Sequence, residues 1–277
     1  MSIALSVQLR AEPRVQTLAL PKLVIVSDVD DSIRFSRVHH KGRAIQYWMG
    51  QLKQRAFTAM PALFNYLANK NIEVKYLSGT LKKFSFLPEK FLLISGFPTG
   101  EIHLRESREE DLADFKFREV AAMMRAQPEA HFILIGDNGQ LDNLAYSRIQ
   151  NDPEFSSRVK AVFIHKLYND ENAKELMAKQ IPYFTSADLA AQLNVMSLIT
   201  DIELREVAKT VEAGTKSKYA EIQLRTLPDL LKLSTRDLED LKILKSSIAD
   251  FETRDIMRSI EESIPMQIMF CKDLFFY

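Results

Sequence analysis

The chain has 277 residues, with 37 basic and 37 acidic side chains and a single cysteine, Cys271. At about 150 residues per domain, this length predicts one large domain or two smaller ones. The zero formal charge argues against a general nucleic-acid-binding protein, because such binding depends on lysines and arginines that neutralise phosphates. One cysteine excludes an intrachain disulfide and a cysteine-rich zinc site.

The sequence lacks the apolar runs of membrane and export signals. No run of about 18 apolar residues occurs, so the sequence predicts no transmembrane helix. Arg10, Glu12 and Arg14 interrupt the apolar core that a secretory signal would need. We therefore expect a cytoplasmic protein, with peripheral membrane contact and delivery to another cell by a signal-independent route left open.

Short apolar runs alternate with helical segments over the first two thirds of the chain. We expect strands over 23–26, 73–77, 131–135 and 159–165, and helices over 61–69, 81–95, 112–126, 141–150, 172–179 and 187–195. This alternation predicts an α/β fold, with a parallel sheet covered by helices on both faces. Ligands of such sheets bind beyond the carboxyl ends of the strands.

The pattern changes at about Leu198. Seven of the eight glycines lie between positions 42 and 139, so the last third of the chain has few tight turns. Helices are expected over 202–211, 219–227 and 235–264. We therefore predict a first domain over 1–197 and an all-helical region over 198–277, whose protein partner the sequence does not indicate.

The first expected strand ends in a cluster of acidic residues. Asp28, Asp30 and Asp31 lie within four positions, directly after the apolar run. Carboxylates placed there could hold magnesium, which prefers oxygen ligands, or could act as a nucleophile and a general acid/base. A solvated acidic turn that caps a helix is the alternative.

Two further strand ends carry polar groups. Ser78 and Gly79 could bind a phosphate through a hydroxyl and backbone amides, or could simply begin a helix. Asp137 and Asp142 follow the strand at 131–135, where an Asn-Gly turn is the plain alternative. Lys116 lies on the helix expected over 112–126, and most such lysines are solvated. Because the carboxyl ends of parallel strands meet at one edge, an anionic substrate with a divalent cation would explain the polar groups of all three strand ends together.

The same strings resemble the haloacid-dehalogenase (HAD) superfamily. Within it they are similar to the phosphatidate phosphatase family of the yeast actin-patch protein, whose catalytic domain is related to that of lipins. The resemblance covers about residues 23–166 and is carried by 28–33 (DVDDSI), 76–80 (YLSGT), 96–100 (GFPTG), 104–105 (LR), 115–116 (FK) and 134–142 (LIGDNGQLD). The sequence departs from the family pattern at Ser32, which replaces a threonine, at Thr80 and Leu81, which replace Ser-Pro, and at Asn138, which replaces a serine.

The resemblance implies a Rossmann-like HAD domain that hydrolyses a phosphomonoester with magnesium. Asp28 would be the nucleophile and Asp30 the general acid/base. The family pattern places Mg²⁺ on Asp28, on the backbone carbonyl of Asp30 and on Asp137, and the phosphoryl group on Ser78, Gly79 and Lys116. Ser32 and Asp142 would support these groups, with Asp142 orienting Lys116 or a metal-bound water.

The 34–60 segment would be a small cap or flap. It contains no acidic residue, has Tyr47 and Trp48 beside its charges, and includes the basic residues Arg34, Arg37, His39, His40, Lys41, Arg43, Lys53 and Arg55. This composition suits an anionic lipid surface, and a solvated loop is the alternative. We expect a phosphatidate-type lipid phosphate as the substrate. A soluble phosphorylated metabolite, or a non-catalytic phosphate-sensing or scaffold role, is the alternative.

Overall fold

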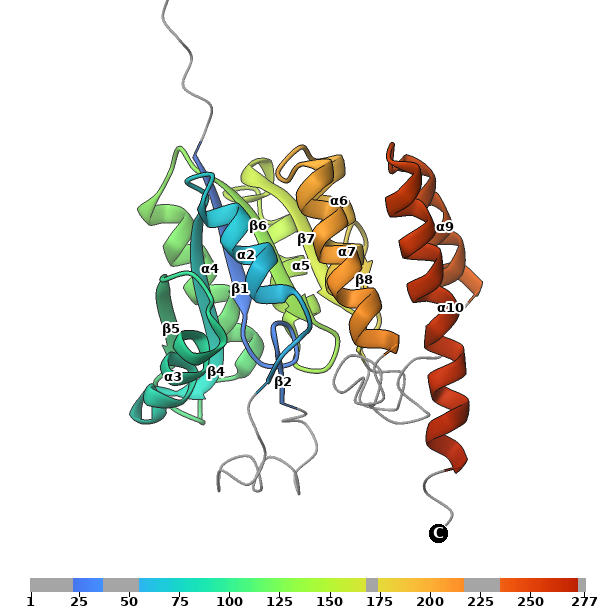
Figure 1. Ribbon diagram of the computed structural model, residues 1–277. Helices are drawn as coiled ribbons and strands as arrows, with labels where there is room; N and C mark the ends of the chain where they lie inside the picture. Colours follow the sequence, from blue (N-terminus) through green and yellow to red (C-terminus); the bar gives the residue numbers. More distant parts are fainter. Residues whose placement is uncertain (1–21, 37–54, 168–173, 217–234, 274–277) are drawn as a thin grey trace, which may run out of the picture.

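Residues 22–36, 55–167, 174–216 and 235–273 are described in the computed structural model of the chain (Figure 1). Their centre is a six-stranded sheet in the order β5-β4-β1-β6-β7-β8, in which every neighbouring pair is parallel. The strands are β1 (Leu23–Asp28), β4 (Glu73–Leu81), β5 (Glu101–Arg105), β6 (His131–Asp137), β7 (Val159–His165) and β8 (Ile181–Tyr183). A small antiparallel pair joins β2 (Arg34–Phe35) to β3 (Arg55–Ala56). The predicted α/β fold is confirmed.

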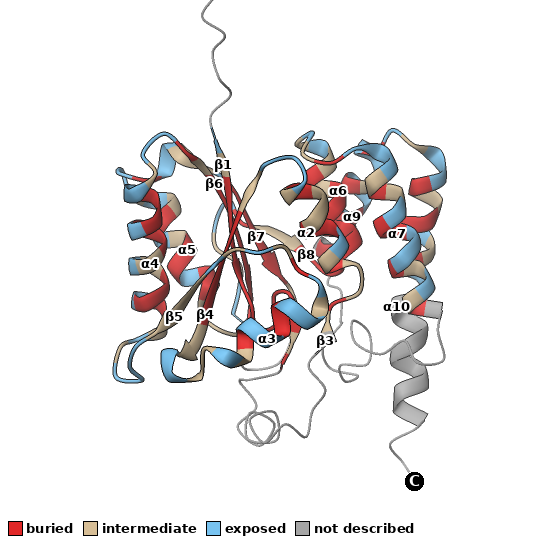
Figure 2. Cartoon of the chain, turned by 60° about the vertical axis from the view of Figure 1, so that its left-hand side comes forward, coloured by how far each residue is buried: buried red, intermediate tan, exposed pale blue. Residues whose placement is uncertain are grey.

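Helices cover both faces of the sheet (Figure 2). One face packs against α4 (Leu112–Ala126) and α5 (Asp142–Asn151). The other packs against α2 (Met60–Ala68), α3 (Phe86–Ser95) and α6 (Ser186–Val195). Successive side chains of a strand point to opposite faces of the sheet. Val24 and Val26 therefore belong to the first apolar cluster, which includes α4 and α5, and Ile25 belongs to the second, which includes α2, α3 and α6. This burial on both sides explains the uninterrupted apolar runs of the central strands.

The C-terminal helices extend the second apolar cluster. They are α7 (Asp201–Lys216), α9 (Thr235–Ser247) and α10 (Phe251–Asp273). Leu204 and Val207 of α7 belong to the same cluster as Ile25 of the central strand, and α7 packs against α2, α6 and α10. The division at residue 197 stays a prediction, and the apolar packing continues across it.

Four predicted elements differ clearly in the structure. The strand at 73–77 continues to Leu81 because it pairs with β5, so the helix expected over 81–95 is a short 3₁₀ turn, Lys82–Phe84, followed by α3. The helix expected over 235–264 is interrupted before α10, where Asp250 caps the new helix by accepting a hydrogen bond from the Thr253 N–H at 2.9 Å. The expected helix at 172–179 is wrong for its described part, 174–179, where the Lys174 N–H donates instead to the carbonyl of Asn138.

Other predictions fall partly outside the described residues. The expected helix at 219–227 lies there, and so does most of the 34–60 segment, with Arg37, His39, His40, Lys41, Arg43 and Lys53. The ends of that segment form the pair β2 and β3. Within the part of the chain that the structure describes, no helix is both long and apolar enough to cross a bilayer.

Candidate active site

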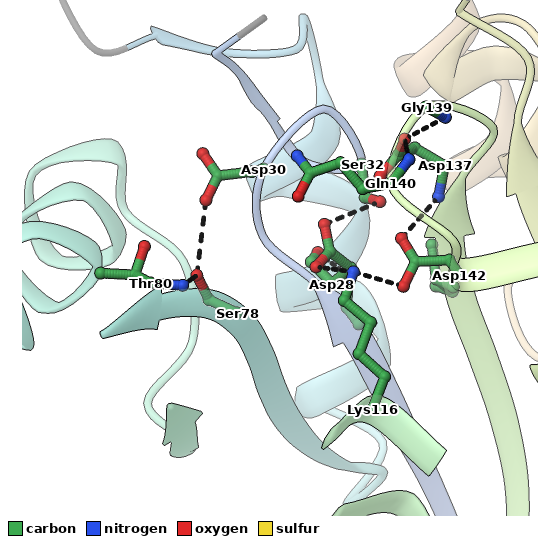
Figure 3. Close-up of polar contacts among 12 residues, drawn as sticks. Asp28, Asp30, Ser32, Ser78, Thr80, Lys116, Asp137, Gly139, Gln140 and Asp142 are labelled. Atoms are coloured by element: carbon green, nitrogen blue, oxygen red, sulfur yellow. Dashed lines mark hydrogen bonds and ion pairs between the residues drawn. The ribbon is translucent and has the colours of Figure 1, made fainter. Parts of the chain in front are cut away.

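Three adjacent strands bring the predicted site residues to one edge of the sheet. β1 lies between β4 and β6, and the register pairs Asp28 with Leu77 on one side and Ser27 with Ile135 on the other. The carboxylate of Asp28 therefore lies beside both neighbouring strand ends (Figure 3). Most of the site is buried: Asp28, Ser32, Ser78, Lys116, Asp137 and Asp142 are inaccessible to solvent, and Asp30 is 4% exposed.

The loop after β1 turns sharply and separates the first two aspartates. Asp31 has a φ of 61°, a left-handed conformation that aspartate adopts more readily than most residues. The Arg34 N–H donates to the carbonyl of Val29 at 2.9 Å and closes the turn. His165 of β7 holds the loop from behind, because its Nδ1 lies 2.7 Å from the carbonyl oxygen of Asp31. As a result, Asp28 and Asp30 face different partners.

Asp28 is bound to the lysine of α4. Lys116 Nζ donates to Asp28 Oδ1 at 2.8 Å and also to Asp142 Oδ1. Ser32 Oγ donates to the other oxygen of Asp28 at 3.3 Å. Burial disfavours the charged lysine, but the charges of Asp142 and Asp28 outweigh burial and raise the pKa of Lys116 above its usual value. Lys116 is therefore a buried cation and not the solvated lysine that its residue type alone would suggest.

The carboxylates of this cluster outnumber its cations. Asp28, Asp137 and Asp142 face one ammonium group, that of Lys116, and their ligand oxygens all lie within 4.8 Å of one another. Burial raises the pKa of Asp28 and of Asp137 well above the usual value, although Lys116 lowers both. A divalent cation would supply two positive charges, which together with the charge of Lys116 would balance three ionised carboxylates.

Asp137 offers an oxygen for such a cation. Its Oδ1 accepts hydrogen bonds from the backbone N–H groups of Gly139 and Gln140, which hold the carboxylate in place. Its Oδ2 is buried and has no hydrogen-bond partner among the described residues. Buried polar atoms are rarely left in this state, and a metal is one explanation. The donor set therefore fits a hard divalent cation, which prefers oxygen ligands.

Asp30 belongs to a second polar network. Arg34 Nε donates to Asp30 Oδ1 at 3.0 Å, and Ser78 Oγ donates to Asp30 Oδ2 at 3.4 Å. The carboxylate of Asp30 is thus outside the cluster of candidate ligands, which includes Asp142 instead. A metal contact through the Asp30 backbone carbonyl stays a prediction. Ser78 Oγ also accepts from the Thr80 N–H at 3.1 Å, so this hydroxyl is fixed at the end of β4.

Arg34 is the residue whose role the sequence interpretation missed. It was grouped with the basic residues of a lipid-facing segment, but its side chain is 1% exposed and its guanidinium lies 5.1 Å from the ring centroid of Phe91. Its position four residues after Asp30 was the available signal. His165 was missed as well, since a histidine that ends an apolar strand has no special spacing.

Two glycines allow close approach around the site. A Cβ on Gly136 would lie 2.5 Å from the Cβ of Asp142, so only glycine lets α5 bring that carboxylate against β6. Gly79, predicted to bind phosphate, lies half-buried beside the side chain of Leu112. Its contact with a phosphate stays a prediction.

The comparison with protein families agrees with this geometry. Residues 23–166, just over half of the chain, match the model of "Phosphatidate phosphatase APP1, catalytic domain". The chain belongs to this family. The family inferred from the sequence motifs is therefore confirmed, and the matched residues of this APP1-family chain run from the first residue of β1 to the residue after β7.

Comparisons with individual proteins are weaker. No curated protein matches the chain. Two similar solved structures are of the class C acid phosphatase from Bacillus anthracis, one of them with tungstate bound. They are 17% and 16% identical, with TM-scores of 0.34 and 0.33, and the similarity covers 51% of this chain and 66% of theirs. The chain thus spans slightly less than two thirds of the length of these structures.

Proposed function

We propose that this APP1-family protein is a magnesium-dependent phosphatase that hydrolyses a phosphatidate-type lipid phosphate through an aspartyl-phosphate. One observation carries the proposal: the buried pair of Asp28 and Lys116 lies beside Asp137 and Asp142, and the cluster has more carboxylates than cations. The family description supports the substrate class. The absence of nucleic-acid binding and a cytoplasmic location remain predictions.

The chemistry of the chain itself follows from these positions. A carboxylate oxygen of Asp28 attacks phosphorus and the bond to the leaving alcohol breaks, while Asp30 donates a proton to the leaving oxygen. Water then attacks the aspartyl-phosphate, with Asp30 accepting its proton, and releases inorganic phosphate. Lys116 orients Asp28, and the Ser78 hydroxyl donates to a phosphoryl oxygen. Mg²⁺ held by Asp28 and Asp137 would reduce the repulsion between the carboxylate and the phosphate.

The decisive experiment removes the nucleophile. We expect Asp28→Asn to lower phosphate release from short-chain phosphatidate at least about a thousandfold, because the amide cannot form the covalent intermediate. Phosphate release with magnesium, and with a chelator, measures the effect in the purified protein. Asp114→Asn is the control, since Asp114 is an exposed aspartate of the helix that carries Lys116.

The outcomes separate the chemistry from the substrate. Wild-type activity in Asp28→Asn would reject the mechanism. Release from a generic aryl phosphate but not from phosphatidate would retain the chemistry and reject the lipid substrate. Failure of the wild-type protein to release phosphate from either compound would reject the enzymatic function.

A further inference from the structure

Helix α3 has apolar side chains on two opposite faces. Its inner face contributes Phe91 and Leu92 to the core, where they are 1% and 6% exposed. Its outer face carries Phe86, Leu93 and Ile94, which are 57%, 80% and 72% exposed. A helix of a soluble domain usually has a polar outer face, and a cluster of exposed apolar side chains marks a contact surface.

This cluster differs from the other exposed apolar residues. Elsewhere in the described part of the chain, large exposed apolar side chains are scattered over separate helices, as Leu144, Val195, Ile202, Ile243 and Phe251. On α3, three of them lie within nine residues. Positions 86, 90, 93 and 94 follow the helical spacing of three and four, so these side chains form one stripe, with Lys90 among the apolar groups.

The charges around the stripe favour an anionic partner. Residues 82–95 contain three lysines, Lys82, Lys83 and Lys90, and one acidic residue, Glu89. All three lysines are exposed, and Lys82 forms an exposed ion pair with Glu106. Apolar side chains interleaved with lysines are typical of helices that lie in a bilayer surface, where apolar burial and attraction to anionic lipids act together. An apolar surface for another protein would not require this excess of lysines.

The position of α3 connects the stripe to the candidate active site. The 3₁₀ turn before it follows directly from β4, whose end carries Ser78 and Thr80. Phe91, on the inner face, lies against Arg34, which binds Asp30. Figure 2 shows α3 beside the end of β4, with much of its surface exposed. The thickness of one helix, about 10 Å, therefore separates the outer stripe from the network of Asp30.

We propose that the outer face of α3, formed by Phe86, Lys90, Leu93 and Ile94, docks on an anionic bilayer that contains phosphatidate. The apolar side chains enter the bilayer surface, and the lysines contact lipid phosphates. Docking then holds the end of β4 close to the headgroups and supplies the lipid phosphate to Ser78 and Asp28. The substrate part of this inference rests on the proposed function, whereas docking itself does not require turnover.

The test uses the full chain and phosphatidylcholine vesicles with and without phosphatidate. In the double variant Leu93→Gln, Ile94→Gln we expect at least about tenfold weaker binding to the vesicles with phosphatidate, because two apolar side chains no longer leave water. Hydrolysis of phosphatidate in those vesicles should fall by a similar factor. Hydrolysis of a water-soluble short-chain phosphatidate should stay at the wild-type level, because both side chains point to solvent.

The matched control is Ile202→Gln, Ile243→Gln, which changes two isoleucines of similar exposure, 68% and 63%, on α7 and α9. This variant should bind vesicles like the wild-type protein. Three results would each overturn the docking proposal: vesicle binding by the α3 variant at the wild-type level, equal weakening of binding in both variants, or no vesicle binding by the wild-type protein. If the α3 variant binds vesicles like the wild-type protein, a protein partner would remain as the occupant of the outer face of α3. If the wild-type protein binds vesicles but hydrolyses no phosphatidate in either form, the proposed function fails while docking stands.

Discussion

Asp28 and Asp30 are only two residues apart, yet each lies in a separate charge network. Asp28 forms an ion pair with Lys116, and Asp30 forms one with Arg34. The left-handed turn at Asp31 produces this separation, because it sends the chain back so that the Arg34 side chain reaches Asp30. These two buried carboxyl groups, although close in sequence, therefore each have a positively charged neighbour of their own.

Arg34 is therefore expected to act as a positioning residue for Asp30, the proposed general acid. Arg34→Lys keeps the charge but cannot reproduce the guanidinium bonds to Asp30. We expect phosphate release from an alkyl phosphate to fall about tenfold to a hundredfold, and release from an activated aryl phosphate to fall much less, since a good leaving group needs little protonation. Steady-state kinetics measures the ratio of the kcat/KM values for the aryl and the alkyl phosphate.

Arg158→Lys provides the comparison, because Arg158 is a partly buried arginine that binds the carbonyls of Met124 and Gln127. It should leave the ratio between the two substrates unchanged. An equal loss on both substrates in Arg34→Lys would show that Arg34 only supports the fold.

At the scale of single elements, helix starts set the local chemistry. Gly136 lets α5 begin directly against β6, which places Asp142 beside Lys116. At the start of α6, Thr185 and Asp188 form a capping box. Burial raises the pKa of Asp188 to about 6, although its hydrogen bonds with Thr185 and the Phe184 N–H lower it.

This raised pKa predicts a dependence of stability on pH. The folded protein binds the proton of Asp188 more tightly than the unfolded chain, so its stabilising contribution is complete below pH about 4 and is lost as the pH rises through 6. The loss amounts to up to about 3 kcal/mol of unfolding free energy. Between pH 4 and 7, the unfolding free energy measured with urea should decrease less in Asp188→Asn than in the wild-type protein.

Asp250→Asn is the control for this experiment. Hydrogen bonds from Thr253 and Arg205 lower the pKa of Asp250 to about 2, so its contribution changes only at lower pH. Its variant should keep the wild-type slope between pH 4 and 6. The same slope in Asp188→Asn as in the wild-type protein would contradict the assignment.

At the scale of the whole molecule, one apolar cluster joins the sheet to the C-terminal helices. Leu204 is inaccessible to solvent and packs in the cluster that contains Ile25 of β1. The helices therefore stabilise the strand that carries Asp28. A separate helical module attached by a linker would instead have its own core.

Leu204→Ala tests this cooperation. The cavity should lower the unfolding free energy by about 2–5 kcal/mol, and loss of phosphate release should coincide with loss of helical circular dichroism. Ile202→Ala, on the same helix but exposed, should cost less than about 0.5 kcal/mol. Separate unfolding of the C-terminal helices, with phosphate release retained, would contradict a shared core.

Much of the fold could be predicted from the sequence. The bounds of α4 and β7 agree with the predicted 112–126 and 159–165, because their apolar periodicity is strong. β5 and β8 were not predicted, since β5 is a partly exposed edge strand and β8 has only three residues. The break before α10 was not predicted, because an aspartate within a helical pattern does not by itself mark the start of a new helix. Asp250 caps α10 only because the chain bends there.

The sequence by itself determined the alternation of strands and helices, the family and, with the help of the family resemblance, the group of Asp28, Lys116, Asp137 and Asp142 at one edge of the sheet. These depend on patterns along the chain and on the rule that the carboxyl ends of parallel strands meet. Only the tertiary structure decided that Arg34 binds Asp30 and that the stripe on α3 faces solvent. Which side chains pair, and which face solvent, depends on the residues that lie close in space. The turn at Asp31 brings Arg34 to Asp30, and the spacing of the two residues along the sequence does not show this contact.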